Sequence, residues 1–431
     1  MTGGANPSSD VLKELENILD SDPFIDEVGF IHPSQFSELV KEVGSSLKDG
    51  LMESEGSEAN TSDSVFWSRD HKLGISTTAL LPLYRAAKHA FMEAIRQYQV
   101  LSESRGERDD SQDGNASRCT STSISILETD IMKHSRVLLL LSCDFGTAWN
   151  FRKVVVSKIQ QLHLYMDELS LSALVLSYSP KSERAWNHRR WVIKMIAGMC
   201  PNLQETVERE SEFVEKLAEK SKMNYRAWNH RSWLVSYMSG EQVLSELNKS
   251  QDWAGLHVAD NSCFHYRVRL LLKILAGFDK LDAGASSATS LRELWKKELN
   301  WVEMLIKRYV GREALWLHRR FLSLSWIKNF TTQVHSNSCS SCPNNMMNVE
   351  VFMDNELQLC HSCCTIPDND FEDYQAQATF SATYIMWLVR QAAGSLPIEL
   401  QKKLQENELK TVVKNVCPDK SFLWDTFNAS I

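Results

Sequence analysis

Apolar and polar residues alternate with the period of an α-helix over most of the chain. Between residues 77 and 101, the side chains of Leu83, Ala87 and Phe91 fall on one stripe, because four residues separate each from the next. After residue 124 the same pattern continues to the end of the sequence, apart from a short break and a Cys-rich insert. The pattern predicts an all-α protein.

The pattern also divides the chain into parts. An extended stretch, DPFIDEVGFIHP, lies between short amphipathic segments near the start. Residues 102–123 lack large apolar side chains and cannot offset the entropy lost on ordering, so we expect a disordered loop there. In order, we expect a partly flexible N-terminal segment at 1–75, a helical-repeat region at 76–330, a Cys-rich insert at 331–370 and C-terminal helices at 371–431.

Composition favours helices and disfavours several classes of partner. The chain has only 17 Gly and 10 Pro in 431 residues, which argues against many tight turns. Lys and Arg total 47 against 55 Asp and Glu, and the net charge of -8 disfavours binding to nucleic acid or anionic lipid. No apolar run is long enough to span a bilayer, and the first residues lack a signal-peptide pattern. We expect a cytoplasmic protein with no membrane span.

A five-fold internal repeat decides the predicted architecture. Each copy has an aromatic residue followed at the third position by an arginine, and the copies are 37, 42, 36 and 52 residues apart. Such spacing is typical of stacked helical hairpins joined by loops of variable length. The five pairs are Trp149 with Arg152, Trp186 with Arg189, Trp228 with Arg231, Phe264 with Arg267, and Trp316 with Arg319.

The second copy shows why the motif belongs on a helix. Trp186, Arg190 and Ile193 lie at positions i, i+4 and i+7, which share one helical face. Ser182 precedes the aromatic by four residues, where its oxygen can accept from the free amides of a first turn. Asn224 and Asp260 occupy the equivalent positions in the third and fourth copies. Each second helix therefore begins just before its aromatic residue.

The third copy carries a specific resemblance. Residues Asn224 to Arg231 read NYRAWNHR. This string resembles the repeat of protein prenyltransferase α subunits, whose second helices open with Asn-Tyr-x-x-Trp-x-x-Arg. Five such units in order extend over roughly residues 130–330. The resemblance implies a right-handed α-α superhelix of stacked helical hairpins that wraps around a catalytic β subunit.

The resemblance also implies a function. This chain would be the non-catalytic α subunit of a heterodimeric protein geranylgeranyltransferase, inactive alone. Degraded repeat prefixes and long polar insertions favour a third type of this enzyme over the farnesyltransferase and Rab geranylgeranyltransferase α chains. The implied β subunit is of the Rab geranylgeranyltransferase type and carries the zinc ion. The co-substrate is a prenyl diphosphate, and the protein substrate, with a SNARE as the implied candidate, carries a cysteine near its C-terminus.

Three residues would face the diphosphate if the resemblance is carried over position by position. Lys181 stands where the family has a lysine directed at the diphosphate, but Glu183 replaces the tyrosine that follows it there. Tyr225 is kept in the next repeat, and Arg226 replaces a histidine. Arginine remains a competent diphosphate ligand because of its planar fork of donors. The alternatives are a solvated lysine in a turn for Lys181 and simple packing for Tyr225.

The repeated residues themselves are expected to be structural. The aromatic residues and arginines named above recur with the scaffold, so packing explains their repetition. His188, His230 and His318 lie two residues after the tryptophan in their copies. We interpret them as hydrogen-bonded core residues rather than bases.

The Cys-rich insert carries a separate signal. Cys339 and Cys342, followed after seventeen residues by Cys360 and Cys363, have the spacing of a four-thiolate structural zinc site. A hairpin turning at Asp354 and Asn355 could join the two pairs. The alternative is a loop of free thiols, since the resemblance implies no metal on an α chain. Four thiolates would leave no open position for catalysis.

A second function stays open from the sequence. Glu183 and the eroded fourth repeat, SCFHYR, are also compatible with an α-solenoid adaptor that binds proteins and has no role in prenyl transfer.

Overall fold

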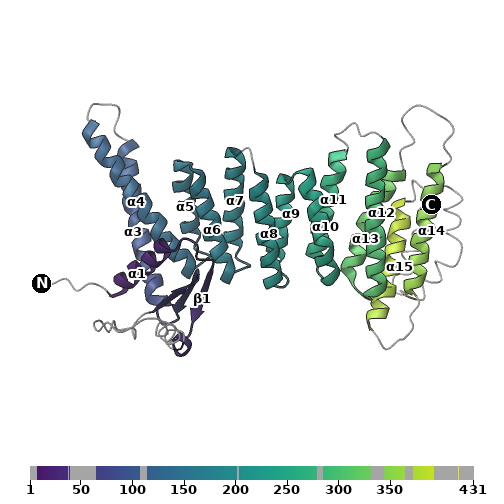
Figure 1. Ribbon diagram of the computed structural model, residues 1–431, viewed down its shortest axis with the longest axis horizontal. Helices are drawn as coiled ribbons and strands as arrows, with labels where there is room; N and C mark the ends of the chain where they lie inside the picture. The colour runs from purple at the N-terminus through teal and green to yellow at the C-terminus, as the bar shows by residue number, and fades with distance from the viewer. Residues whose placement is uncertain are drawn as a thin grey trace, which may run out of the picture. The chain divides into compact units, whose positions relative to one another are not determined.

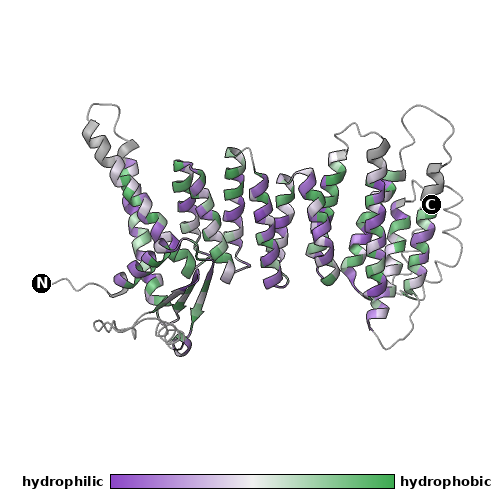
Figure 2. Ribbon diagram, viewed as in Figure 1, coloured by the Kyte–Doolittle hydropathy of each residue, from purple (hydrophilic) through white to green (hydrophobic). Residues whose placement is uncertain are grey.

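The computed structural model describes residues 7–36, 38, 65–106, 114–200, 203–278, 285–331, 344–364, 372–392 and 416. The chain divides into two compact units, residues 1–230 and 231–431, here named unit 1 and unit 2. In both units the helices contain hydrophobic and hydrophilic residues side by side (Figure 2), as expected for amphipathic helices packed on neighbours.

Unit 1 begins with a small mixed module and continues as helical hairpins (Figure 1). Its elements are α1 (Pro7–Ser21), β1 (Glu27–Ile31), β2 (Phe66–Arg69), β3 (Lys72–Ser76), α3 (Leu80–Gly106), α4 (Gly114–Leu141), α5 (Gly146–Ile159), α6 (Leu162–Tyr178), α7 (Glu183–Met199), α8 (Gln204–Lys220) and most of α9 (Tyr225–Leu234).

Unit 2 consists of helices among the residues that the structure describes. After the end of α9 and a short 3-10 turn (Val235–Tyr237), its elements are α10 (Gly240–Leu256), α11 (Asn261–Phe278), α12 (Ala285–Arg308), α13 (Glu313–Trp326), a π-helical stretch (Ile327–Thr331), α14 (Asn344–Cys364) and α15 (Glu372–Ala392). Consecutive helices pair as antiparallel hairpins, α10 with α11, α12 with α13 and α14 with α15. The predicted all-α class of stacked helical hairpins is confirmed.

A three-stranded sheet in unit 1 is an addition that the sequence did not predict. The strand order is β1-β3-β2, with β1 parallel and β2 antiparallel to β3. The extended stretch near the start is confirmed as β1. Strands β2 and β3 have four and five residues, too few for their period to be distinguished from irregular chain. The hairpin between them turns at Asp70 and His71, both with positive φ, as a type I′ turn requires.

The sheet is held against the helical hairpins by apolar contacts. Strand β1 packs on α6, and the rings of Phe30 and Tyr178 meet edge to face with centroids 5.3 Å apart. Helix α1 packs on α3 and α4, where Leu15 and Leu83 are fully buried. The module is therefore part of the folded unit, and the predicted flexibility of 1–75 does not apply to α1, β1, β2 and β3.

The predicted disordered loop at 102–123 is wrong for most of its length. Helix α3 continues to Gly106, and α4 begins at Gly114; residues 107–113 lie outside the described residues. A helix already nucleated by packing further along can extend into a polar segment at little cost, because each added residue also adds a hydrogen bond. Composition alone therefore underestimated the helix.

Candidate functional site

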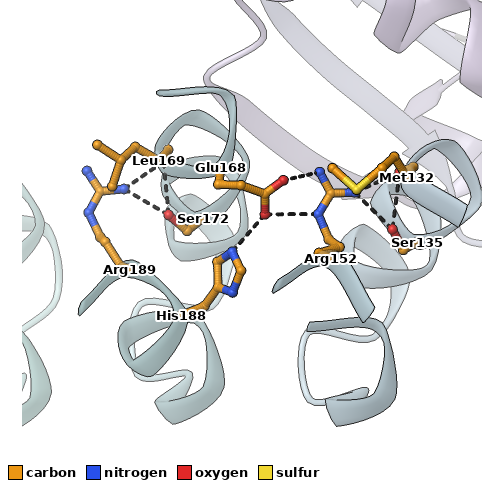
Figure 3. Close-up of polar contacts among 8 residues, drawn as sticks. All are labelled: Met132, Ser135, Arg152, Glu168, Leu169, Ser172, His188 and Arg189. Atoms are coloured by element: carbon orange, nitrogen blue, oxygen red, sulfur yellow. Dashed lines mark hydrogen bonds and ion pairs between the residues drawn. The ribbon is translucent and has the colours of Figure 1, made fainter. Parts of the chain in front are cut away.

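The hairpins of unit 1 are joined by a buried cluster of Arg152, Glu168 and His188. Arg152, on α5, donates from Nε and Nη2 to the Glu168 carboxylate of α6 at 3.0 and 2.5 Å, and His188, on α7, contacts the same carboxylate through Nε2 at 2.7 Å. Figure 3 shows the three side chains converging from three helices. All three are almost completely buried, so the charges satisfy one another away from water.

Arg152 and Arg189 also connect the two helices of their own hairpins. Arg152 Nη1 donates to the Met132 carbonyl oxygen at 2.6 Å and to Ser135 Oγ at 2.8 Å, both on α4 (Figure 3). Arg189 repeats the arrangement one hairpin later, on Leu169 and Ser172 of α6 at 2.6 and 3.0 Å. A single guanidinium therefore bridges the two helices of its own hairpin and the first helix of the next.

The cluster recurs through both units. Its third member is histidine in some copies and tyrosine in others, and both contact the glutamate. The further copies are Arg189, Glu210 and His230 in unit 1, and Arg231, Glu246 and Tyr266; Arg267, Glu298 and His318; and Arg319, Glu356 and Tyr384 in unit 2. Because the repetition follows the scaffold, these residues hold the hairpins in register and are not a catalytic centre.

Burial and charge act in opposite directions on the carboxylates. Burial alone raises the pKa of Glu168, but the positive charge of Arg152 and the hydrogen bond from His188 outweigh it and lower that pKa to about 2. Glu210 and Glu298 behave in the same way, with pKa values of about 2. Burial lowers the pKa of His188, His230 and His318, so the histidines are neutral donors and the interpretation as core residues agrees with their positions.

The glutamates are the residues that sequence reasoning missed. Glu168, Glu210, Glu246 and Glu298 lie eighteen residues before the repeat aromatic of their own hairpin. The interval from the glutamate to the aromatic residue is constant, although loops elsewhere differ in length. This constancy could have identified the glutamates as part of the repeat. An isolated glutamate on an amphipathic helix is normally assigned to the solvent face, so only the interval could have identified them.

The repeat tryptophans are buried and hydrogen-bonded. Trp186 Nε1 donates to the Pro180 carbonyl oxygen at 3.0 Å, and Trp149 Nε1 donates to the Cys143 carbonyl oxygen at 2.8 Å. Both exposed fractions are 2%. The start of α7 is confirmed as predicted, because Ser182 Oγ accepts from the Ala185 amide at 3.4 Å. The repeat frame therefore also fixes the turn that precedes each second helix.

The structure brings the predicted diphosphate-facing residues to neighbouring positions in unit 1. The turn between α6 and α7 contains Lys181, and its Pro180 carbonyl oxygen accepts from Asn224 Nδ2 at 2.9 Å, directly before Tyr225. Arg226 Nη1 lies 2.8 Å from Glu183 Oε2. Lys181 and Tyr225 are exposed, Tyr225 by 67%. Packing is therefore not the role of Tyr225, and Arg226 already has a carboxylate partner.

In unit 1 the charge of the second helices is opposite to that of the first helix α8. Helices α5, α7 and α9 contain Glu183 as their single acidic residue, whereas α8 contains six glutamates against three basic residues. Lys153, on α5, places its Nζ over the Trp191 ring of α7 at 5.7 Å, and burial lowers its pKa. Burial also lowers the pKa of Arg190. Helices α5 and α7 therefore carry an excess of basic side chains, several of them exposed, which suits anionic groups.

The Cys-rich insert differs from its predicted form. Residues 344–364 form α14, so the hairpin predicted at Asp354 and Asn355 is wrong. A helical alternative fits the segment because its apolar residues pack against α15. Cys339 and Cys342 lie outside the described residues, so the structural zinc stays a prediction.

Three cysteines, Cys360, Cys363 and Cys364, lie at the end of α14. Cys360 Sγ lies 3.8 Å from Cys364 Sγ and 3.7 Å from the Ser381 carbonyl oxygen. The hydrogen bond to Cys364, together with burial, raises the pKa of Cys360, and burial raises that of Cys363. Within the described residues, no group of three or more His, Cys, Asp or Glu side chains is arranged to bind a metal ion.

A search of the helices in the described part of the chain finds none that is long and apolar enough to cross a membrane.

The sequence matches known proteins over the repeat region. The family model of the protein prenyltransferase alpha subunit repeat matches residues 165–196, 207–238 and 295–326. Each match begins on a first helix, extends to the last turn of the paired second helix or just beyond it, and includes the glutamate, the tryptophan and the arginine of that hairpin.

Curated relatives match over less than half of the chain. Protein prenyltransferase alpha subunit repeat-containing protein 1 of Homo sapiens is 30% identical over 234 residues, which cover 43% of this chain and 56% of that protein. The protein of the same name in Danio rerio is 31% identical, covering 44% and 53%. Geranylgeranyl transferase type-2 subunit alpha of Saccharomyces cerevisiae is 24% identical, covering 47% and 60%. The chain thus spans about half the length of the curated relatives it matches.

Proposed function

Because the chain belongs to the family of proteins built from protein prenyltransferase alpha subunit repeats, we propose that it is the non-catalytic α subunit of a heterodimeric protein prenyltransferase. The observation that carries the proposal is the placement of Lys181, Tyr225 and Arg226 on adjoining turns beside a basic surface. The name of the yeast relative, a geranylgeranyl transferase subunit, supports geranylgeranyl diphosphate as the co-substrate.

The proposed reaction is attack by a substrate cysteine thiolate on the first carbon of the prenyl diphosphate. The carbon–oxygen bond breaks, and the electron pair leaves with the diphosphate. A zinc ion bound by the β subunit would keep the thiol deprotonated at neutral pH. This chain would act on the leaving group, with Lys181 and Arg226 neutralising the developing charge and the Tyr225 hydroxyl donating a hydrogen bond.

The ion pair between Arg226 and Glu183 determines which contact the diphosphate must replace. A diphosphate that approaches Arg226 must compete with the Glu183 carboxylate, 2.8 Å away. Both side chains are substantially exposed, by 41% and 64%, so the pair is weak and exchangeable. In the heterodimer with the β subunit, we propose that the Arg226 side chain leaves Glu183 and contacts the diphosphate.

The proposed partners follow from the same assignment. The β subunit would be of the Rab geranylgeranyltransferase type, and the protein substrate, with a SNARE as candidate, would present a cysteine near its C-terminus. The pair would act in the cytoplasm. The basic surface on α5 and α7 supports a partner with a complementary acidic surface.

Co-expression with candidate β subunits, followed by sizing, tests the assembly. We expect a one-to-one complex with one of them, and no turnover of geranylgeranyl diphosphate by this chain alone. Lys181→Ala and Arg226→Ala should each lower the single-turnover transfer rate by about ten- to hundred-fold, as expected when one charge-stabilising group is removed. Lys216→Ala, an exposed lysine on α8, is the matched control and should leave the rate unchanged.

An adaptor without a role in prenyl transfer is the second candidate function. The ion pair of Arg226 with Glu183 favours it, because this contact neutralises one of the three proposed diphosphate ligands. Unchanged transfer rates for Lys181→Ala and Arg226→Ala in an intact complex would support the adaptor and contradict the proposed role of these residues.

A further inference from the structure

Unit 2 contains an apolar cavity that the proposed function does not use. It has a volume of about 470 Å³ and lies between α10, α11 and α12. Its apolar lining comes from Val243, Leu244, Ile274, Leu291 and Leu294. The volume is within the range of small-molecule sites, roughly 300–1,000 Å³. The cavity is open to solvent on one side, because Lys273, Gly277 and Lys297 in its lining are exposed.

Two glycines lie at the open side of the cavity. Gly240 is the first residue of α10 and Gly277 the penultimate residue of α11, and both line the cavity and are exposed. A Cβ atom added at either position would meet no atom within 4 Å. A larger side chain at either position can therefore enter the open space without a clash. Leu244 remains 46% exposed beside this space, although burying it would be favourable.

The charged residues of the lining give the cavity a positive excess. Glu293 is paired with Lys296 at 2.9 Å, and Lys296 does not line the cavity. Lys273 and Lys297 also line it, and Lys273 Nζ donates to a backbone carbonyl oxygen at 3.4 Å, a contact that leaves its charge uncompensated. An apolar space with two ammonium groups is complementary to a hydrocarbon chain that ends in an anion.

We propose that this cavity binds a single-chain amphiphile, with its hydrocarbon chain between α10, α11 and α12 and its anionic head group on Lys273 and Lys297. The chain would gain burial against the five apolar side chains, and the head group would remain at the mouth, within reach of water. The proposal is independent of prenyl transfer, because Lys181, Tyr225 and Arg226 belong to unit 1.

Binding is measured with 11-(dansylamino)undecanoate, whose emission increases in apolar surroundings. We expect saturable binding to the full chain, competition by dodecanoate, and competition at least tenfold weaker by dodecyltrimethylammonium. Lys297→Glu should weaken dodecanoate binding about tenfold or more. Equal competition by the anionic and cationic amphiphiles would overturn the assignment of the head group.

A variant with a larger side chain in the cavity is compared with a variant altered outside it. Gly277→Leu places a side chain in the open space and should abolish probe binding while the protein stays folded by circular dichroism. Gly255→Leu is the matched control, because Gly255 is the penultimate residue of α10, has no atom within 4 Å of an added Cβ and does not line the cavity. Binding should persist in that variant.

Two results would contradict the proposal. One is a folded Gly277→Leu variant that binds the probe as tightly as the unaltered chain. The other is loss of protein–protein association in Gly277→Leu without any effect on the amphiphile, which would assign the cavity to an apolar side chain of a partner.

Discussion

At the scale of single residues, the repeated unit is a buried carboxylate with two partners on different helices. Removing charges from water is expensive, and a buried ion pair is often no more stable than an apolar pair of the same shape. Here the carboxylate of Glu168 is fully buried and accepts from both Arg152 and His188. The arrangement fixes the register of each hairpin against the next, because a hairpin shifted along its neighbour would leave a charged side chain unpaired in the core.

The first prediction concerns the loss of one carboxylate. Glu168→Ala leaves the Arg152 guanidinium buried without its partner, so unfolding of unit 1 should become easier by about 3–5 kcal/mol. Urea unfolding followed by tryptophan fluorescence measures the change. Glu212→Ala, an exposed glutamate of α8, serves as the control and should change stability by no more than about 0.5 kcal/mol.

An effect of similar size in both variants would contradict the structural role assigned to the buried glutamate. Glu168→Gln gives a finer comparison, because the amide keeps the volume and can still accept hydrogen bonds from both partners. It should lose less stability than the alanine variant, and its loss relative to the unaltered chain reports the charge together with the hydrogen bond from Arg152 Nη2, which an amide nitrogen cannot accept.

The second prediction concerns pH. In the folded chain His188, His230 and His318 have lowered pKa values, so below about pH 6.5 the unfolded chain binds protons that the native chain does not. Glu168, Glu210 and Glu298 have folded pKa values of about 2, below the ordinary 4.5, so unfolding takes up further protons as the pH falls from about 4.5 towards 2. Both groups make stability fall with acidity.

Urea midpoints measured between pH 8 and pH 3 test this dependence. We expect a midpoint that is nearly constant above pH 7, declines from about pH 6.5 and declines more steeply below about pH 4.5. A midpoint that increases on acidification would contradict neutral histidines and ionised glutamates in the core. In His188→Asn the early part of the decline should be smaller.

At the scale of helices and turns, one glycine sets the approach to a second helix. Gly311, which lies between α12 and α13, has a φ of 75°, a conformation that side chains with a Cβ rarely adopt. An added Cβ would also lie 2.7 Å from the Asp373 carbonyl oxygen. The amide of Gly311 donates to Gln377 Oε1 at 3.0 Å, and the same oxygen accepts from Trp316 Nε1 at 3.1 Å.

The third prediction follows from that geometry. Gly311→Ala should lower the stability of unit 2 by more than about 1 kcal/mol, because it combines an unfavourable φ with a backbone clash. Gly198→Ala is the control, since Gly198 lies within α7 and has no atom within 4 Å of an added Cβ. Alanine there should be neutral or stabilise by up to about 1 kcal/mol.

Thermal unfolding of both variants gives the measurement. If Gly311→Ala were as stable as Gly198→Ala, the left-handed turn would not be a constraint on the α12–α13 connection.

Much of the helical architecture was predictable because its signals are local. Spacing of apolar residues and the capping position of Ser182 predicted the second helices, and the aromatic and arginine positions fixed the repeat. The strands β2 and β3, the helical residues 114–123 and the helix through the Cys-rich insert were missed. The strands depend on the pairing of β3 with the distant β1, and α14 packs against α15. Residues 114–123 continue a helix that is nucleated further along the chain. Local patterns report none of these effects.

The candidate site was predictable only in part. Lys181, Tyr225 and Arg226 were identified by position in the repeat, and the structure places them on adjoining turns. The ion pair between Arg226 and Glu183 joins residues 43 positions apart and follows from the stacking of hairpins. The buried glutamates required the same knowledge, because burial rather than residue type distinguishes Glu168 from an exposed neighbour.

At the scale of the whole molecule, the net charge hides local differences between helices. The net charge of -8 alone would suggest an acidic surface throughout. In unit 1 the second helices α5 and α7 are nevertheless basic, while α8 among the first helices is acidic. A partner recognised by the second helices would therefore be attracted over distances of about a Debye length, roughly 8–10 Å at moderate salt.

The fourth prediction is that the basic side chains of α5 and α7 control association with the proposed β subunit. The double variant Lys153→Glu and Lys194→Glu reverses two charges on α5 and α7, and should lower the association rate constant about tenfold or more at low ionic strength. The difference in association rate constant between the double variant and the unaltered chain should become smaller as salt is added, since screening weakens electrostatic steering. Stopped-flow measurements over a series of salt concentrations provide the comparison.

The double variant Lys216→Glu and Lys220→Glu on α8 is the matched control, because both lysines are exposed and the net charge changes by the same amount, and it should alter the rate much less. An equal effect of both changes would mean that only the net charge matters and that the second helices are not the recognition surface. A slower association of the Lys153→Glu and Lys194→Glu variant that persists in high salt would instead show that these two lysines act by direct contact, because screening removes long-range attraction but not a desolvated ion pair.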